Sequence, residues 1–207
     1  MAQFFVIHPV NPQARLIRQA AQIIRDGGVV VYPTDSCYAL GCHLGDKVAV
    51  ERIRAIRNID ARHHLTLICR DLSELGNYAR VNNQQYRLLR AATPGSYVFI
   101  LEASRELPKR LQHPKRRTIG LRIPDHPVVA ALLTELGEPL LSSTLILPGS
   151  DLPLTDAEEI RERIAPLVDL ILDGGSCGVD PSTVIDLTSP TPVVTRVGKG
   201  PLGILGL

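Results

Sequence analysis

Residues 29–42 read VVVYPTDSCYALGC, an apolar and β-branched run that passes directly into proline, hydroxyl and carboxyl side chains. The run Val29–Tyr32 predicts a buried strand, because strands covered on both faces are continuous in apolar residues. Thr34, Asp35 and Ser36 follow where that strand ends. Ligand contacts in α/β proteins gather at such strand ends, although hydroxyl and Asx turns use the same residue types. The stretch therefore predicts an α/β fold and a candidate polar site.

Helical and strand patterns alternate along the rest of the chain, which is typical of a layered helix–sheet–helix α/β domain. Several connections are too short for a crossover helix, so we expect a mixed sheet rather than a purely parallel one. We expect helices to begin at Asn11-Pro12, Asp46 and Thr155 (with Glu158 in the capping-box position) and to cover 82–92 and 125–136, with stops at Gly27 and Gly137. Further strands are expected at 65–69, 97–101, 118–123, 139–143, 168–172, 183–187 and 193–197.

The composition is that of a globular protein rather than a disordered one, with 44% hydrophobic and 21% charged residues among 207. That length fits a single domain, residues 1–207. No apolar run reaches the roughly 18–20 residues that span a bilayer, and the N-terminal stretch lacks a signal-peptide pattern. We therefore expect a soluble cytoplasmic protein without membrane contact.

Four cysteines are present, at positions 37, 42, 69 and 177, and no two of them form a CxxC pair. This pattern predicts reduced, buried thiols and no structural metal site. A reactive thiol at Cys37, whose neighbours are polar, is the alternative.

Positive charge is concentrated although the net charge is only +2. Between Arg105 and Arg122, seven basic residues stand against one acid, Glu106, and a second basic stretch runs from Arg52 to Arg70. Such asymmetry suits a polyanion, either a nucleotide or a nucleic acid, and a solvated face is the alternative. The candidate RNA contacts in the first cluster are Lys109, Arg110, Lys115, Arg116 and Arg117.

Two other patterns give little evidence of a binding site. Gly198–Gly203 matches GxGxxG, but no helix can follow it within the 207 residues to hold a pyrophosphate. His63 and His64 are adjacent, without the spacing of a metal-binding motif around them. No Walker A sequence occurs, so ATP would have to be held in another way.

Two apolar strands carry polar side chains of greater interest. Arg122 lies in the Thr118–Pro124 segment, and a guanidinium there must find an anion or hydrogen-bond acceptors, because burying it unpaired is costly. Ser182 and Thr183 bring hydroxyls to the edge of another strand.

Four segments occur in one order: Tyr-Pro-Thr-Asp-Ser-x-Tyr-x-Leu-Gly from Tyr32, Thr-Pro-Gly at 93–95 before a Phe-Ile-Leu strand, Gly-Leu-Arg-Ile-Pro at 120–124, and Pro-Ser-Thr-Val-Ile-Asp at 181–186. Together they resemble the YrdC/YciO family over about residues 14–200, and Leu-Pro-Gly-Ser at 147–150 is most similar to the YciO branch. The resemblance implies a single-domain, three-layer α/β fold, with a twisted mixed β-sheet flanked by helices and a positively charged concave groove.

The activity that the resemblance implies is that of an L-threonylcarbamoyladenylate synthase, a nucleotidyltransferase. L-Threonine, bicarbonate and ATP give threonylcarbamoyl-AMP and pyrophosphate for the t6A37 modification of tRNA, and family members are also associated with double-stranded RNA and tRNA binding. This chemistry needs positioning and cations around phosphates rather than a covalent nucleophile. Mg²⁺ is expected only with ATP, with Asp35 as a candidate carboxylate for it.

The resemblance also implies roles for individual residues. Thr34, Ser36, Thr144 and Ser182 would hold L-threonine or a similar small molecule. Arg57 and Arg122 would act in catalysis and, together with Arg196, bind the nucleotide.

The sequence departs from the synthase pattern at two places. Arg57 stands where a lysine is expected and Ile59 where an arginine is expected, while Ile146 replaces the asparagine of a Ser-x-Asn signature. Losing one cation and one amide from a phosphate site would slow the reaction about 10²–10⁴-fold. We therefore expect altered or weakened catalysis, unless His63 and His64 replace the missing cation.

Three hypotheses remain open: a synthase-like enzyme, a double-stranded RNA or tRNA-binding module, and a regulator that senses a nucleotide or amino acid. With no Trp and three Phe, stacking on single-stranded bases is disfavoured, so RNA would be recognised by backbone and shape. The sequence leaves open whether the chain is a monomer or a homodimer.

Overall fold

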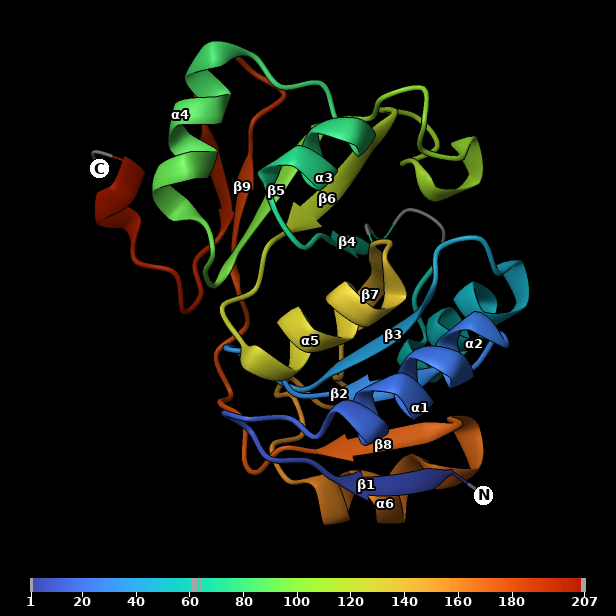
Figure 1. Ribbon diagram of the computed structural model, residues 1–207. Coiled ribbons are helices and arrows are strands. Elements are labelled where there is room, and N and C mark those ends of the chain that lie inside the picture. Colours follow the sequence, from blue (N-terminus) through green and yellow to red (C-terminus); the bar gives the residue numbers. More distant parts are fainter. Residues whose placement is uncertain (1, 61–62, 64, 206–207) are drawn as a thin grey trace.

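A computed structural model describes residues 2–60, 63 and 65–205 (Figure 1). The strands are β1 (Gln3–Val6), β2 (Val30–Tyr32), β3 (Ala39–His43), β4 (Thr66–Ile68), β5 (Tyr97–Glu102), β6 (Thr118–Arg122), β7 (Leu140–Thr144), β8 (Leu170–Asp173), β9 (Thr183–Asp186) and β10 (Val193–Arg196). The α-helices are α1 (Ala14–Arg25), α2 (Lys47–Arg57), α3 (Leu72–Tyr78), α4 (Asn83–Ala92), α5 (Pro127–Leu136) and α6 (Ala157–Ile164). Short 3-10 turns cover Lys109–Leu111, Ala165–Leu167 and Leu202–Leu205.

The strands of the described residues form one ten-stranded sheet in the order β1-β8-β2-β3-β7-β4-β6-β5-β9-β10. Four neighbouring pairs are parallel, β1/β8, β2/β8, β4/β6 and β5/β9. The remaining pairs are antiparallel. The prediction of a mixed sheet is therefore confirmed.

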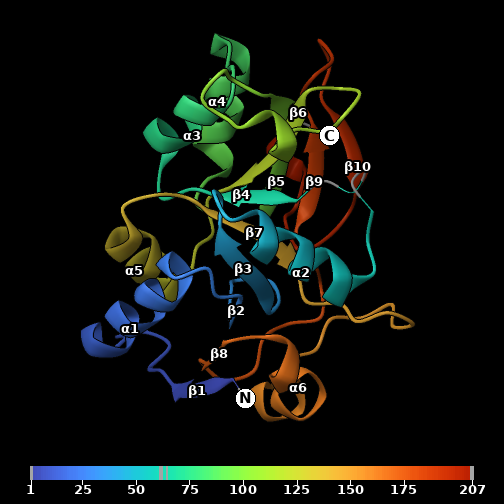
Figure 2. The same cartoon turned by 90° about the vertical axis from the view of Figure 1, so that its right-hand side faces the viewer.

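Alternating apolar positions of the strands bury two faces against helices. On one face α1 and α5 lie side by side over β8, β2, β3 and β7, with Tyr32 and Leu140 in the shared core (Figure 1). On the other face α2 and α6 pack over the same strands, while α3 and α4 cover the half formed by β5, β6 and β9 (Figure 2). No helix among the described residues is long and apolar enough to cross a membrane.

The sequence analysis missed three elements. Only six residues separate β3 from β2, and the two strands pair antiparallel with Tyr32 opposite Ala39, so the polar stretch between them connects two neighbouring strands. β1 is a four-residue edge strand. α3 had a readable start signal, since the Asp71 carboxylate accepts a hydrogen bond from the amide of Glu74 at 2.8 Å.

Asp46 begins α2 as predicted, accepting from the amide of Ala49 at 2.9 Å. The prediction for α1 was wrong, because the helix begins at Ala14 without a side-chain cap. Asn11 instead belongs to a separate turn in which the His8 ring accepts its amide. α5 also begins later than expected, at Pro127 after His126.

The predicted cap of α6 was wrong by one residue. Asp156, not Thr155, is the N-cap, and its carboxylate accepts from the amide of Glu159 at 2.9 Å. The backbone oxygen of Thr155 accepts from Cys177, which ties the preceding loop to a different segment.

We expect Asp156→Ala to lower the free energy of unfolding by about 1 kcal/mol, because the amide of Glu159 loses its acceptor. Thr155→Ala is the matched control and should change stability by less than about 0.5 kcal/mol. Urea denaturation of the two variants and the parent measures both values. An equal loss in the two variants would contradict the assignment of Asp156 as the cap.

Candidate functional site

A cavity of about 310 Å³ lies on the sheet. Its lining includes side chains from β2, β3, β7, β4, β6, β5, β9 and β10, which are consecutive neighbours in the sheet. Laid flat at the usual strand spacing, these strands would extend over about 34 Å. One small cavity can be reached from all of them only because the sheet curves around it.

The cavity brings together the residues that the sequence analysis proposed for the substrate and the nucleotide. Six of them line it: Thr34, Arg57, Arg122, Thr144, Ser182 and Arg196. Ser36 lies beside it, with its hydroxyl 3.0 Å from Arg122 Nη1 and 3.5 Å from the Ser182 hydroxyl. These residues come from strand ends and from the C-terminus of α2, so the sheet's curvature rather than chain proximity assembles them.

Arg122 finds its anion within the protein. Its Nη2 lies 2.5 Å from Asp35 Oδ1, and the Asp35 carboxylate also accepts from the Ser96 hydroxyl at 2.6 Å. Burial lowers the pKa of Arg122, and the carboxylate of Asp35 opposes that shift. The buried Nε of Arg122 has no hydrogen-bond partner among the described residues, so one donor of this group remains unmet.

Arg57 and Arg196 carry positive charge into the cavity without an ion-pair partner. Neither lies within 4 Å of a carboxylate of the described residues. Arg57 Nη1 donates to the backbone oxygen of Thr144, and Arg196 donates through Nε and Nη2 to that of Ser182 at 3.1 and 2.9 Å. Burial, followed by the nearby charge of Arg196, lowers the pKa of Arg57. An anion in the cavity would offset both desolvation and repulsion.

The hydroxyl groups of the site divide into two sets. Thr34 forms a hydroxyl turn, since its Oγ1 donates to the backbone oxygen of Cys37 at 2.7 Å and accepts from the amide of Ser36. The hydroxyls of Thr66, Ser143 and Thr144 line the cavity and have no hydrogen-bond partner among the described residues. The second set is therefore free to bind a ligand, and the sequence analysis did not single out Thr66 or Ser143.

The two replaced positions lie in different surroundings. Ile146 lines the cavity, whereas Ile59 is partly buried and packs against the core. His63 also lines the cavity, and burial together with Arg57 and Arg196 lowers its pKa from 6.5, which disfavours its cationic form. This direction argues against His63 as a replacement for the missing cation. His64 lies outside the described residues.

The proposed RNA contacts lie on the β5–β6 connection and do not line this cavity. Arg116 pairs with Asp186 at 2.5 Å, and Arg110 donates to the backbone oxygens of Leu44 and Gly45. Lys109, Lys115 and Arg117 are exposed, and none has an ion-pair partner in the described part of the chain. In the second basic stretch, arginines 52, 54 and 70 are all paired with acids.

The four cysteines are free thiols, and all except Cys177 are buried. Burial raises the pKa of Cys37 to about 11, so its nucleophilic thiolate form is scarce at neutral pH. This favours the structural interpretation of Cys37 over a reactive thiol. The described residues contain no cluster of three or more His, Cys, Asp or Glu side chains that could hold a metal ion.

Gly198 explains part of the GxGxxG pattern. A Cβ at this position would lie 2.0 Å from the backbone oxygen of Pro181, so only glycine allows the backbone at 198 to approach the backbone at 181 this closely. The following Lys199 donates to the backbone oxygen of Asp35. The glycine-rich segment thus packs against Pro181 and is hydrogen-bonded to the loop that carries Asp35.

Comparison with protein-family models shows a match of residues 22–198 to the Sua5, YciO and YrdC model, which is described as telomere recombination. The chain belongs to the Sua5/YciO/YrdC family. The resemblance noted from the sequence motifs is thereby confirmed.

Members of two kinds resemble this chain. Protein YciO of Escherichia coli is 56% identical over 200 residues, 97% of each chain, and its crystal structure superposes with a TM-score of 0.96 over 99% of this chain and 100% of that one. A threonylcarbamoyl-AMP synthase of Chromobacterium violaceum is 34% identical over 183 residues, 87% of this chain and 93% of the synthase. The crystal structure of P. abyssi Sua5 complexed with L-threonine is 28% identical, with a TM-score of 0.84 over 94% of this chain and 58% of Sua5. The family member described here is therefore related to the synthases and more similar to YciO.

A double-mutant cycle tests the Arg122–Asp35 pair. Arg122→Met leaves a nearly buried carboxylate unpaired and should lower the free energy of unfolding by about 3–5 kcal/mol. Asp35→Asn combined with Arg122→Met should cost less than the sum of the single changes, with a coupling of about 1–3 kcal/mol in urea denaturation. Strictly additive losses would mean that the two side chains do not stabilise each other.

Proposed function

We propose that the central cavity binds the phosphates of ATP together with L-threonine or a similar small amino acid, and forms threonylcarbamoyl-AMP more slowly than the synthases do. The observation that carries this proposal is the pair of guanidinium groups, Arg57 and Arg196, that face the cavity without a carboxylate partner in the described residues. Relationship to the synthases and the L-threonine complex of P. abyssi Sua5 support the same substrates.

In the proposed reaction a carbamate oxygen of N-carboxythreonine attacks the α-phosphorus of ATP, and pyrophosphate leaves. Negative charge then grows on the transferring phosphoryl oxygens, where Arg57 and Arg196 would stabilise it. The free hydroxyls of Thr66, Ser143 and Thr144 would orient the polar groups of the substrates. Mg²⁺ would arrive with ATP and neutralise part of the phosphate charge.

Arg122 has a more limited role in this proposal than the sequence analysis gave it. Because Asp35 neutralises its charge, Arg122 chiefly positions Ser36, whose hydroxyl lies 3.5 Å from that of Ser182, and offers its unmet Nε to a substrate oxygen. Asp35 is in turn engaged by Arg122 and Ser96. Both carboxylate oxygens of Asp35 are thus engaged within the protein, which disfavours Asp35 as a ligand for Mg²⁺.

Ile146 is the residue that we expect to weaken catalysis. It presents an apolar surface to the cavity where the synthase pattern has an amide. An apolar side chain can neither donate to a phosphate oxygen nor orient a carboxylate, and the lost hydrogen bond costs about 10²–10³-fold in rate.

The reaction is tested with ATP, Mg²⁺, bicarbonate and L-threonine, following pyrophosphate release and detecting threonylcarbamoyl-AMP by mass spectrometry. We expect slow, threonine-dependent product in the parent, loss in Arg57→Ala and Arg196→Ala, and at least tenfold faster turnover in Ile146→Asn. Ile146→Leu is the matched control and should leave the rate unchanged. Absence of product in both the parent and Ile146→Asn would overturn the synthase proposal.

RNA binding is a second candidate, favoured by the exposed side chains of Lys115 and Arg117 on one turn, neither of which has an ion-pair partner among the residues that the structure describes. We expect Lys115→Ala/Arg117→Ala to reduce the slope of log affinity against log salt for duplex RNA by about two, because each phosphate contact contributes about one. This pair of changes leaves the Arg116–Asp186 ion pair in place. Arg15→Ala/Arg87→Ala, which removes the same charge from exposed helix surfaces, is the control. An unchanged slope would remove these residues from any RNA contact.

A further inference from the structure

A second concave region lies at the outer end of the sheet, apart from the central cavity. The parallel strands β5 and β9 are neighbours and end at Glu102 and Asp186. The segments that follow them form the walls of two cavities, of about 770 and 660 Å³, which share Arg80 and Glu102. No residue lining either cavity also lines the central one. We call these two adjacent cavities the outer groove.

The smaller cavity of the outer groove is strongly basic. Its lining has one carboxylate, Glu102, and five cationic side chains: Arg80, Arg105, Lys109, Arg116 and Arg117. Arg116 is paired with Asp186, and the other four have no carboxylate within 4 Å in the described part of the chain. Cations gathered around a concave surface with low-dielectric walls focus a positive potential that attracts a multivalent anion.

The backbone supports this arrangement at Arg117. Its φ of 54° is the left-handed conformation, which side-chain-bearing residues rarely adopt. Two backbone hydrogen bonds hold it there, from the Arg117 amide to His113 and from Ala103 to the Arg117 oxygen, both at 3.0 Å. The turn thus keeps two consecutive arginines, Arg116 and Arg117, in the lining of the cavity.

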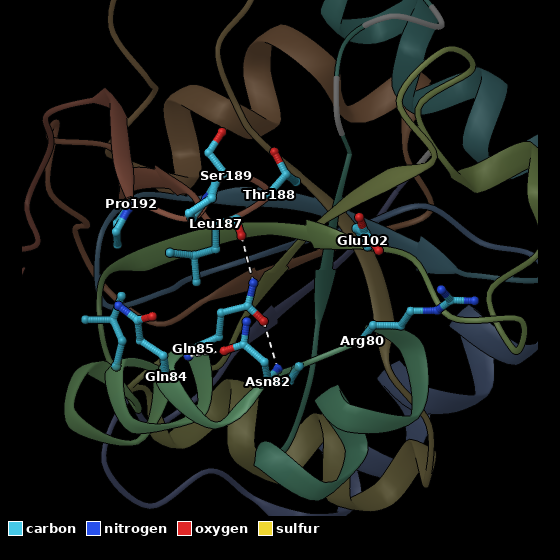
Figure 3. Close-up of a pocket in the computed structure, with 12 residues that line it drawn as sticks. Arg80, Asn82, Gln84, Gln85, Glu102, Leu187, Thr188, Ser189 and Pro192 are labelled. Carbon is cyan, nitrogen blue, oxygen red and sulfur yellow. Dashed lines mark hydrogen bonds between the residues drawn. The ribbon is translucent and has the colours of Figure 1, made fainter.

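The larger cavity has a different character. Figure 3 shows Arg80 and Glu102 at one end of it and Gln84 and Pro192 at the other. Gln85 donates to the backbone oxygen of Leu187 at 2.7 Å and fixes one wall (Figure 3). The apolar lining consists of Val81, Leu88, Leu187, Pro190 and Pro192. The side-chain amide of Gln84 and the hydroxyl of Ser189 have no hydrogen-bond partner among the described residues.

Apolar walls with a free amide suit a flat heterocycle, since glutamine can both donate to and accept from the edge of a base. A nucleotide joins such a group to a string of negative charges. We propose that the outer groove is a second nucleotide site that binds a nucleoside polyphosphate, with the base in the larger cavity and the phosphates in the basic one. The proposal does not depend on the reaction proposed for the central cavity.

Binding is tested by NMR titration of the ¹⁵N-labelled full chain with ATP in the absence of metal, and with inorganic triphosphate as the second probe. We expect ATP to shift amides at 187–192 and 103–117 in addition to any shifts at the central cavity. Arg105→Ala/Lys109→Ala should lower the affinity of the outer groove for both probes at least tenfold, as measured from the concentration dependence of these shifts. Arg15→Ala/Arg18→Ala removes equal charge from the exposed surface of α1 and should leave them unchanged.

A third variant tests where the base lies. Gln84→Ala should weaken ATP binding at the outer groove several-fold and leave triphosphate binding unchanged, because only ATP carries a base.

Arg57→Ala/Arg196→Ala should abolish shifts around Thr34 and Ser182 while the outer groove still responds, which separates this proposal from the first. Shifts confined to the central cavity, or an equal loss in the charge-matched control, would overturn the second site. Duplex RNA that shifts the outer groove where ATP does not would also overturn it.

Discussion

The ion pair between Arg122 and Asp35 is the interaction on which the central cavity depends. A guanidinium in the middle of the sheet is too costly to bury unpaired, so the carboxylate must be brought to it from a loop 87 residues earlier. Ser96 donates to the same carboxylate, and Lys199 donates to the backbone oxygen of Asp35. Three segments distant in the sequence therefore converge on one residue, and the loop between β2 and β3 is held against β6.

Holding that loop in place has consequences for the cavity as a whole. The hydroxyls of Thr34 and Ser36 are used within the loop and toward Arg122, so they build the wall rather than remain free for a ligand. The unused capacity for binding then lies elsewhere in the lining, in Arg57, Arg196 and the free hydroxyls of β4 and β7. Neutralising Arg122 internally leaves the other two arginines as the positive charge that a substrate meets.

The sequence predicted much of this arrangement, and the reasons are local. Apolar runs and the Asp46 cap depend on neighbouring residues only, so β2, β5, β6 and α2 could be placed from them. Family motifs identified six of the residues that line one cavity. What could not be predicted depends on distant partners: that Asp35 is the anion of Arg122, and that Asp186 engages Arg116. The outer groove was hidden for the same reason. Segments 103–117 and 187–192 meet through the pairing of β5 with β9, and residues 80–85 join them through hydrogen bonds from the Arg80 amide to Glu102 and from Gln85 to Leu187.

Binding and catalysis should respond differently to the replacement at Ile146. Attraction between a guanidinium and a phosphate acts over several ångströms and tolerates small displacements. A hydrogen bond from an amide works only near 2.7–3.2 Å and close to linear geometry, and a transition state is stabilised only when that geometry is met. A cavity that keeps Arg57 and Arg196 but presents Ile146 can therefore retain affinity for phosphates while it loses the orientation that the reaction needs. On the function proposed above, this physical difference would let a member of the family keep its ligands and slow its chemistry.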